Sequence, residues 1–589
     1  MNLGGGGGKS LLARLRDGLR RQEAPAPLGT LMSRTDAVAE RLSAAAMEEL
    51  FAARAGCQAV AAAFARFVGE PGGRQAIRKA LHIALEDRMR AVALTADPPE
   101  RNGFGPIPAI SLGWPLDGAA ARALGLSPPP RRIGFHLLAV AGVLTQAVLL
   151  AVEAVAALAA PGRPPAARQH FSVAIPNFTH PHYWQAILDA VRERLGNRPD
   201  LLLLINDQGR SGDAGPGTVG VDPKRLPVRR GPWLRDVVLP SLRLLAAVLG
   251  RIAVAPFDGA VLEAARGAFF EARQTLPTRR LLDNFAIRHY VDHTEYTATH
   301  VARASILHQS GGLMVRWPHC VMDNPGAALS YLGYDLFLSG GAVEKRDHGA
   351  TWSASLRPVV SGLIKNDRRL NEGQRVAPDI EARIAAHRAA GGRVAAYFGM
   401  SPVPGFEVCV RDTLEAMADA LAGRPEWLLV VKAKGPRSLH VLERVFPDCA
   451  GFRRMRDAGR VLVVPYDQPG FEPCAAGWLC GHMDFGVGFG SVQAEALVRG
   501  IPHFCYYPVM QDTPTQRLLA GCGLLHDDVA TFRVALGRWL DAPEGFLLPI
   551  DVCREAYDRF ADDQALDRVA ELLWCEEGAS GLARRQARP

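Results

Sequence analysis

The sequence predicts an α/β protein in which two doubly wound, Rossmann-like domains follow an α-helical N-terminal region. Short apolar runs alternate with helical stretches over residues 166–375, and the same alternation restarts over residues 376–589. Alternation of this kind predicts a mainly parallel sheet covered by helices on both faces. A chain of 589 residues is also too long for one hydrophobic core, so several domains are expected.

Residues 1–30 are expected to form a flexible tail. Their glycine run ends in Gly8-Lys9-Ser10 and resembles a phosphate-binding P-loop, but Leu3 stands where that motif needs its first glycine. No predicted strand precedes the run, and a glycine-rich segment without such an anchor behaves as flexible coil. We therefore expect no nucleotide site in this tail.

Residues 31–165 are expected to be helical, with one long apolar helix at 133–160. From Ile133 to Val152 the chain carries twenty residues without a formal charge, enough to cross a bilayer core of about 30 Å. Gln146 and Glu153 are seven positions apart and share one helical face, which suits a helix in the membrane interface or in a bundle. Three alternatives stay open: interfacial contact with a membrane, a full span, and a packed soluble helix.

The strands of the two α/β domains are predicted from short apolar runs between turn signals. In the first domain these runs are 171–175, 201–205, 251–255, 304–308, 313–317 and 334–338. In the second they are 393–399, 426–434, 460–466, 485–490 and 502–507, with helices at 407–422, 437–446 and 491–499. A polar, charged segment at 363–379 separates the two domains, and the end of the chain, about 529–575, is predicted to be helical.

Composition narrows the classes of partner and site. The apolar content is 48% and the charged content 22%, which excludes a disordered chain. The net charge of +8 favours anionic partners such as nucleotide phosphates, acidic glycans or anionic lipid. No basic run is interleaved with aromatic residues, so no nucleic-acid partner is expected.

The ten cysteines are scattered and form no C-x2-C pair, so we expect buried reduced thiols and no metal site. No cleavable signal peptide is recognised, because Arg14, Arg16 and Asp17 interrupt the first apolar residues. The expected location is the cytoplasm, with the chain free, peripheral or anchored at the inner face of the membrane. No cofactor is expected.

The stretch "GFGSVQAEALVRGIPHF" at 488–504 is the most informative motif. It follows a predicted strand with two glycine turns, Gly488 and Gly490, and then opens a helix. Ligands of doubly wound domains lie beyond the carboxyl ends of strands, where glycines let the backbone approach a phosphate closely. Ser491 can cap the helix and donate a hydroxyl. Glu495 lies one turn further on and can accept hydrogen bonds from ribose hydroxyls.

This stretch resembles the nucleotide-binding signature of GT-B glycosyltransferases, in which glycine turns, a glutamate and a G-x-P sequence close the donor site. Retaining members have a pair of glutamates separated by seven residues; Glu495 matches the second, and Val487 stands where the first belongs. The resemblance therefore favours inverting and polymer-building relatives such as glycerophosphotransferases of the CDP-glycerol type. It implies an acceptor-side domain at 166–375 and a nucleotide-donor domain at 376–589. Further donor-binding residues implied by similar segments are Gly399, Ser401, Lys432 or Lys434, Asp512 and Gln516.

On the acceptor side, the resemblance points to a catalytic base facing the cleft. "WPHCVMDNPG" resembles a His-Gly segment of the family, with Cys320 in place of the glycine. We assign His319 as the base and Asp323 as its orienter, with His180 or His182 of "FTHPHYW" as rivals. Other acids and histidines of residues 289–308, including Glu295, are weaker candidates; His289 and His293 have the spacing of metal ligands on a helix but no complete ligand set.

The function that the sequence predicts is transfer of a sugar or polyol phosphate from a nucleotide-activated donor to a surface glycan or lipid-linked acceptor. One alternative is a nucleotide-sugar 2-epimerase on the same two-domain scaffold. Another is a non-catalytic interaction protein on a transferase scaffold, because fold does not guarantee chemistry.

Overall fold

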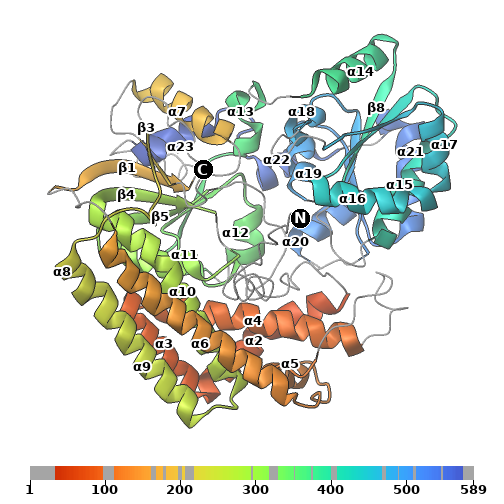
Figure 1. Cartoon of the computed structure of the whole chain (residues 1–589). Helices are drawn as coiled ribbons and strands as arrows, with labels where there is room; N and C mark the ends of the chain where they lie inside the picture. Colours follow the sequence, from red (N-terminus) through yellow and green to blue (C-terminus); the bar gives the residue numbers. More distant parts are fainter. Residues whose placement is uncertain are drawn as a thin grey trace, which may run out of the picture.

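The structure is a computed structural model of the chain. It describes residues 34–96, 112–160, 167–176, 181–196, 202–205, 218–293, 296–317, 329–349, 352–353, 355–372, 376–399, 407–466, 473–488, 490–508, 513–545 and 548–574. These residues form a helical layer and two α/β domains (Figure 1).

The helical layer lies below the first sheet in Figure 1. Its helices are α2 (Arg34–Ala53), α3 (Ala55–Val68), α4 (Gly72–Ala96), α5 (Asp117–Ala123), α6 (Ile133–Ala156) with η2 (Ala157–Ala159), α8 (Arg230–Trp233), the π-helix η3 (Leu234–Val238), α9 (Leu239–Val254) and α10 (Gly259–Asn284). Helix α10 packs against α3, α4, α6 and α9, and its buried residues include Phe269. Helices that precede residue 169 in the sequence and helices that follow residue 221 therefore form one layer around α10.

The first sheet has seven parallel strands in the order β3-β2-β1-β4-β5-β6-β7. The strands are β1 (Gln169–Pro176), β2 (Leu202–Ile205), β3 (Thr218–Val221), β4 (Phe285–Asp292), β5 (Leu313–Arg316), β6 (Leu336–Ser339) and β7 (Arg357–Val360), with helices α7 (Pro181–Leu195), α11 (Thr299–His308) and α12 (Val343–His348). Strand residues alternate between two cores: Met314 and Phe337 join the core of the helical layer, whereas Val315 and Leu338 join the core on the other face.

Two predicted strands of this domain are helix ends instead. Residues 251–255 fall at the end of α9, and residues 304–308 fall in α11. Leu244, Val248 and Ile252 recur every four positions and are buried, so the apolar run belongs to a helical stripe. A run of five apolar residues does not separate a strand from a buried helix end.

The second sheet has six parallel strands in the order β10-β9-β8-β11-β12-β13. The strands are β8 (Arg393–Phe398), β9 (Trp427–Lys432), β10 (Val461–Val463), β11 (Phe485–Gly488), β12 (His503–Tyr506) and β13 (Leu525–His526). The helices are α14 (Pro378–Ala389), α15 (Glu407–Leu421), α16 (Pro436–Val445) with η7 (Phe446–Asp448), α17 (Ala450–Asp457), α18 (Ala476–Cys480), α19 (Ser491–Leu497), α20 (Pro514–Gly521), α21 (Val529–Asp541) with η8 (Pro543–Gly545), and α22 (Ile550–Tyr557). Two doubly wound domains behind a helical region are the predicted fold class, which is confirmed.

The two domains are not separated by a single boundary at residue 376. After β7 the chain passes through η6 (Ile364–Asn366) and α13 (Arg368–Glu372) into the second domain. The last described helix, α23 (Ala565–Trp574), returns to the first domain and packs on α7 and β1 (Figure 1). Its Leu566, Val569 and Trp574 are buried in the core of that domain. The chain therefore crosses between the domains twice.

The described cysteines are all free, and most are buried. Burial raises the pKa of the Cys449 thiol to about 12 and that of Cys553 to about 11. Both thiols are therefore protonated and unreactive at neutral pH, as expected for small buried hydrophobic residues.

Candidate functional site

The candidate site lies at the carboxyl edge of the second sheet. The strand order reverses between β8 and β11, which is the place where doubly wound sheets hold their ligands. The register puts Lys432, Phe398 and Gly488 in one row across β9, β8 and β11 at this edge. The motif predicted from the sequence therefore occupies the topological switch point of its domain.

The two glycines of the motif meet different requirements. Gly488 has φ +147, and a Cβ there would lie 2.5 Å from the carbonyl oxygen of Phe398. Gly490 has φ +118, and nothing lies within 4 Å of the position a Cβ would take. Gly488 thus allows close packing of β11 on β8, while Gly490 is required by its backbone conformation and leaves open space beside it.

Ser491 and Glu495 share one partner, the ammonium group of Lys365. Lys365 Nζ donates to Ser491 Oγ at 3.0 Å and to Glu495 Oε1 at 3.1 Å. Glu495 is 2% exposed, whereas the Lys365 side chain is 23% exposed. Lys365 belongs to η6, in the connection between the domains. The structure thus brings a cation from outside the second domain to the two polar side chains of the motif.

The connection that carries Lys365 is itself held in place. Asp367 accepts a hydrogen bond from the backbone N–H of Leu566 in α23 at 2.8 Å, and another from the N–H of Arg369. Burial raises the pKa of Asp367, and these hydrogen bonds act against the rise. Lys365 is therefore positioned by contacts with the first domain and α23 on one side and with α19 on the other.

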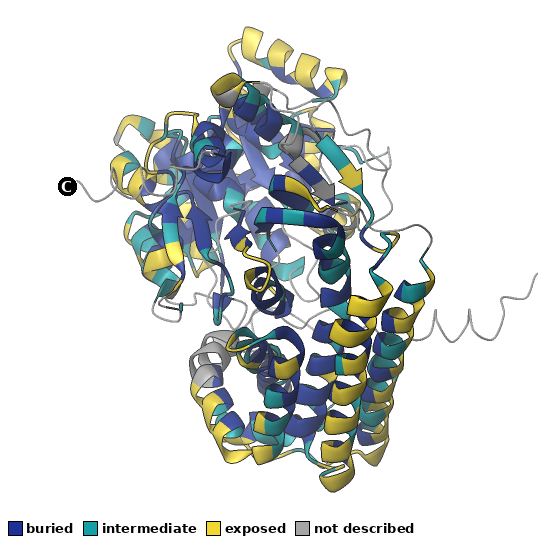
Figure 2. Ribbon diagram, turned by 90° about the vertical axis from the view of Figure 1, so that its left-hand side faces the viewer, coloured by how far each residue is buried: buried dark blue, intermediate teal, exposed yellow. Residues whose placement is uncertain are grey.

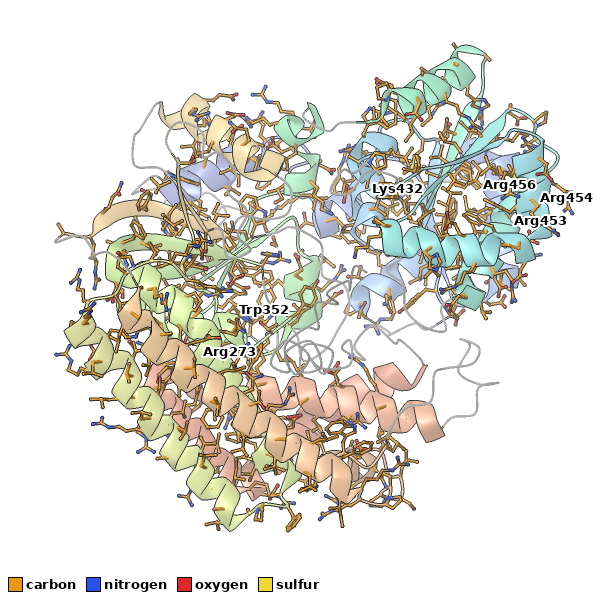
Figure 3. All side chains as sticks on the ribbon, viewed as in Figure 1. Arg273, Trp352, Lys432, Arg453, Arg454 and Arg456 are labelled. Carbon is orange, nitrogen blue, oxygen red and sulfur yellow. The ribbon has the colours of Figure 1, made fainter. Side chains whose placement is uncertain are left out.

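Of the other predicted donor-binding residues, Gly399 and Lys432 lie at the ends of β8 and β9, and Lys434 is exposed just beyond β9. Gly399 follows β8 and donates its N–H to the Lys432 carbonyl at 2.7 Å. Lys432 is 5% exposed, and its Nζ lies 3.4 Å from both the Ala433 carbonyl and the Tyr466 hydroxyl. Figure 3 shows Lys432 within the second domain and the arginines 453, 454 and 456 of α17 on its outer side.

Gln516 lies in α20, beside the first domain. It is buried, and its backbone N–H donates to Thr513 Oγ1 at 3.1 Å. The neighbouring Thr515 hydroxyl bonds Arg346 and Asp347 of α12. Ser401 and Asp512 lie outside the described residues. Helix α20 therefore contributes a contact between the two domains.

The predicted catalytic base and its rivals fall on residues whose side chains the structure does not describe. His180, His319, Asp323 and Glu295 lie outside the described residues, and His182 lies in α7 at a position where only the backbone is described.

Three of the described histidines of the first α/β domain are buried, stacked on an aromatic ring or paired with a carboxylate. His289 is buried in β4, and burial lowers its pKa to about 4. His293, which has the spacing of a metal-ligand partner only on a helix, follows the same strand instead. About 13 Å of extended chain therefore separates the two histidines and excludes shared chelation. His300 stacks on Tyr334 with ring centroids 4.7 Å apart, and His308 pairs with Asp335 at 2.9 Å. Among the described residues, no group of three or more His, Cys, Asp or Glu side chains could hold a metal ion.

The carboxyl edge of the first sheet is packed against the second domain. At Gly340, which follows β6, a Cβ would lie 2.2 Å from the Tyr557 carbonyl oxygen of α22. Beside it, Arg316 is fully buried, with Nη1 3.1 Å from Glu344 Oε1 and 2.9 Å from the Leu338 carbonyl. The two domains therefore meet at the carboxyl ends of the first sheet's strands, where doubly wound domains bind ligands.

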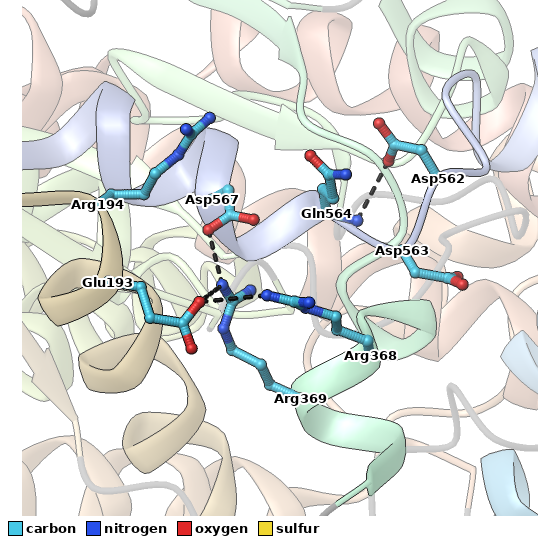
Figure 4. A pocket seen from close by; sticks show the side chains of 8 residues that line it. All are labelled: Glu193, Arg194, Arg368, Arg369, Asp562, Asp563, Gln564 and Asp567. Atoms are coloured by element: carbon cyan, nitrogen blue, oxygen red, sulfur yellow. Dashed lines mark hydrogen bonds and ion pairs between the residues drawn. The ribbon is translucent and has the colours of Figure 1, made fainter.

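A hollow of about 420 Å³ lies elsewhere, between α7, α13 and the start of α23 (Figure 4). Arg369 pairs there with Glu193 and with Asp567 at 2.9 Å, and the hydrogen bond from Arg369 lowers the pKa of Glu193. Arg368 also pairs with Glu193, at 3.2 Å. Because these charges neutralise one another, we assign this hollow to the ion pairs that hold α23 in place.

Lys365 is the residue of the site that sequence reasoning missed. It stands in the polar segment 363–379, which predicts only a boundary between domains. A single lysine in such a segment has no spacing relative to the motif 126 positions later, so only the fold reveals the contact.

No protein-family model and no curated protein matches this sequence. The structure is similar to that of an enzyme described as a putative UDP-N-acetylglucosamine 2-epimerase from Listeria monocytogenes, with a TM-score of 0.41, 13% identity, and coverage of 72% of this chain and 99% of that chain. It is similar to the wall teichoic acid polymerase TagF, with a TM-score of 0.41, 10% identity, and coverage of 77% and 99%. It is also similar to an α,α-trehalose-phosphate synthase from Burkholderia vietnamiensis, with a TM-score of 0.40, 13% identity, and coverage of 72% and 99%.

Proposed function

We propose that this protein is a GT-B-type transferase that binds a nucleotide-activated sugar or polyol donor at the carboxyl edge of its second sheet. The acceptor in this proposal is a surface glycan or a lipid-linked precursor, and the transfer is inverting. The observation that carries the proposal is the meeting of Lys365, Ser491 and Glu495 at the switch point of the second sheet, where the two domains meet.

The three side chains suit the parts of a nucleotide donor. An ammonium group and a hydroxyl bind phosphate oxygens, and a buried carboxylate accepts hydrogen bonds from ribose hydroxyls. When the donor reacts, the leaving group gains negative charge, and a positioned cation stabilises that charge. The leaving group is a nucleoside diphosphate if a sugar is transferred and a nucleoside monophosphate if a polyol phosphate is transferred. In this proposal Lys365 supplies the cation and exchanges part of its bond with Glu495 for the phosphate.

We expect Glu495→Ala to weaken nucleotide binding roughly 10-fold or more. Loss of a charge-assisted hydrogen bond to ribose costs about 1.5–3 kcal/mol. Calorimetric titration with UDP, GDP and CDP measures the effect on the full chain.

Two further lysine variants test which part of the nucleotide Lys365 contacts. Lys365→Met should weaken nucleotides more than the corresponding nucleosides, because it removes the proposed phosphate partner as well as the hydrogen bond to Glu495. Lys345→Met, at an exposed position of α12, should change neither. Unchanged affinity of Glu495→Ala for every nucleotide, with the wild-type protein binding at least one, would contradict the assignment.

His319→Ala is expected to slow turnover about 100-fold or more, because removal of a general base costs about that factor. Nucleotide affinity should stay within a few-fold of wild type, since His319 is not one of the proposed donor contacts. His180→Ala is measured in the same assay, because His180 is the rival for this role. If only His180→Ala loses turnover, the base lies in the 178–183 segment; if both stay active, an acid such as Asp323 or Glu295 takes the role.

Product analysis distinguishes this function from the alternatives. A transferase incubated with a panel of nucleotide sugars and glycan acceptors releases free nucleotide and extends an acceptor. A 2-epimerase returns an isomerised nucleotide sugar without needing an acceptor. Binding without either product would favour the non-catalytic alternative.

A further inference from the structure

Two long apolar helical segments lie side by side in the helical layer. One is α6 with η2, residues 133–159, and the other is the continuous helix α8–η3–α9, residues 230–254. At one end the rings of His136 and Phe257 lie 5.4 Å apart, and at the other end the Trp233 indole N–H donates to the Ala154 carbonyl at 2.8 Å. These contacts at opposite ends show that the two segments run antiparallel along their whole length.

One side of each segment is buried against the other helices of the layer. In α6 the buried residues include Val143, Leu150 and Ala154, and this helix packs on α10. In α9 the buried residues include Leu244 and Val248, and this helix packs on α3. Neither segment can span a membrane as a separate helix without leaving the core that its inner side helps to build.

The outer side of each segment is apolar and exposed. Both segments are long and apolar enough to cross a membrane, yet only 22% of one and 28% of the other is buried. In Figure 2 the long helices of this layer carry buried residues on one side and exposed residues on the other. The large exposed side chains are Ile133, Leu137, Leu138, Leu144, Val148, Val152 and Val155 on α6, and Leu234, Leu239, Leu242, Val254 and Phe257 on or beside the second segment. An apolar face of this extent marks an interaction surface.

The formal charges of the two segments and their ends have one prevailing sign. Residues 131–160 and 229–257 hold seven arginines and two carboxylates, Glu153 and Asp236. Asp258, which follows, pairs with Arg54. Arginines stand at both ends of the pair of segments, because Arg131 and Arg132 precede α6 near the end of α9 and the others accompany the second segment.

The charge pattern decides between occupants of the face. A second copy of this chain, related by a twofold axis, would bring arginines opposite arginines. An anionic bilayer surface offers both an acyl region for the apolar stripes and negative headgroups for the arginines. We propose that the face formed by α6 and α8–η3–α9 binds the surface of an anionic lipid bilayer, with both helices lying in its plane. This proposal does not depend on the proposed function, because it uses none of the donor-site residues.

Co-sedimentation of the full chain with vesicles tests the proposal. The vesicles are phosphatidylcholine alone, or phosphatidylcholine with phosphatidylglycerol at about 30% of the lipid. We expect binding to the anionic vesicles, weakening at high salt because exposed charges are screened. Val148→Asp with Leu242→Asp should reduce the affinity about 10-fold or more, because both side chains leave the acyl region. Arg243→Glu with Arg251→Glu should reduce it by a similar factor.

A matched charge control comes from the second domain. Arg453→Glu with Arg456→Glu makes the same charge change on α17, outside the proposed face (Figure 3), and should leave vesicle binding unchanged. Thermal unfolding of every variant should match wild type, since all six positions are exposed.

Three results would overturn the proposal. They are absence of binding to either vesicle, equal loss of binding in the α17 control, and concentration-dependent dimerisation that the Val148→Asp and Leu242→Asp changes abolish while vesicles stay unbound. The last result would assign the face to a second copy of the chain.

Discussion

Removal of residues 1–165 is expected to leave an insoluble chain. Helices α3, α4 and α6 cover α10, whose Leu262, Phe269 and Leu276 are buried in the same core. Deletion would expose this apolar surface, and each large side chain that loses burial gives up about 1.5–3 kcal/mol. Expression followed by separation of soluble and insoluble protein measures the outcome.

The predicted domain boundary at residue 165, taken alone, would instead indicate that the rest of the chain is an independent two-domain core. Removal of residues 1–30 only, the predicted flexible tail, is the control and should leave a soluble chain with wild-type thermal unfolding. A soluble 166–589 fragment that unfolds cooperatively would show that α10 can find other partners.

Arg316→Met is expected to destabilise the first domain by about 3–5 kcal/mol, because it leaves the buried carboxylate of Glu344 without its guanidinium partner. Arg316 and Glu344 have side-chain exposures of 0% and 2%, so water cannot replace the lost interaction. Urea unfolding should show a lower midpoint for the transition of this domain.

Arg74→Met is the matched control for that experiment. Arg74 pairs with Glu70 at 2.8 Å, but the two side chains are 48% and 50% exposed, so the change should cost only about 0–1 kcal/mol. Restoring stability with the double change Arg316→Met and Glu344→Leu would support the interpretation. Equal effects of the two single changes would contradict it.

The second domain is predicted well from the sequence because its strands are regular and its helices are short. The predicted runs at 393–399, 426–434 and 485–490 coincide with β8, β9 and β11. Each is bounded by glycine, proline or charged residues, so local pattern and tertiary structure agree. The first domain is predicted less well, because α9 and α10 are inserted between β3 and β4 and their pairing with residues 34–156 depends on contacts across the whole chain.

In the candidate site, too, some residues are predicted from local pattern and others only from contacts across the chain. Gly488, Gly490, Ser491 and Glu495 are found from spacing, because a glycine turn followed by a helix has a local physical meaning. The predicted cap by Ser491 is wrong: Gly490 is the N-cap of α19, and no described side chain caps this helix. The contact of Lys365 with the motif and the packing of α23 on the first domain depend on the two places where the chain crosses between the domains. No local sequence pattern predicts either contact. Membrane contact by residues 133–160 was one of three alternatives from composition; the pairing with residues 230–254 is visible only in three dimensions.

The path of α23 has a consequence for the order in which the protein is made. Synthesis at the ribosome delivers the first sheet early, but Leu566, Val569 and Trp574 belong to the core that covers its face beside α7. That core stays open until nearly the whole chain has emerged, whereas the second domain already has all its strands by residue 526. The second domain can thus finish folding before the first, and a nascent chain carries an uncovered apolar sheet face for chaperones to shield.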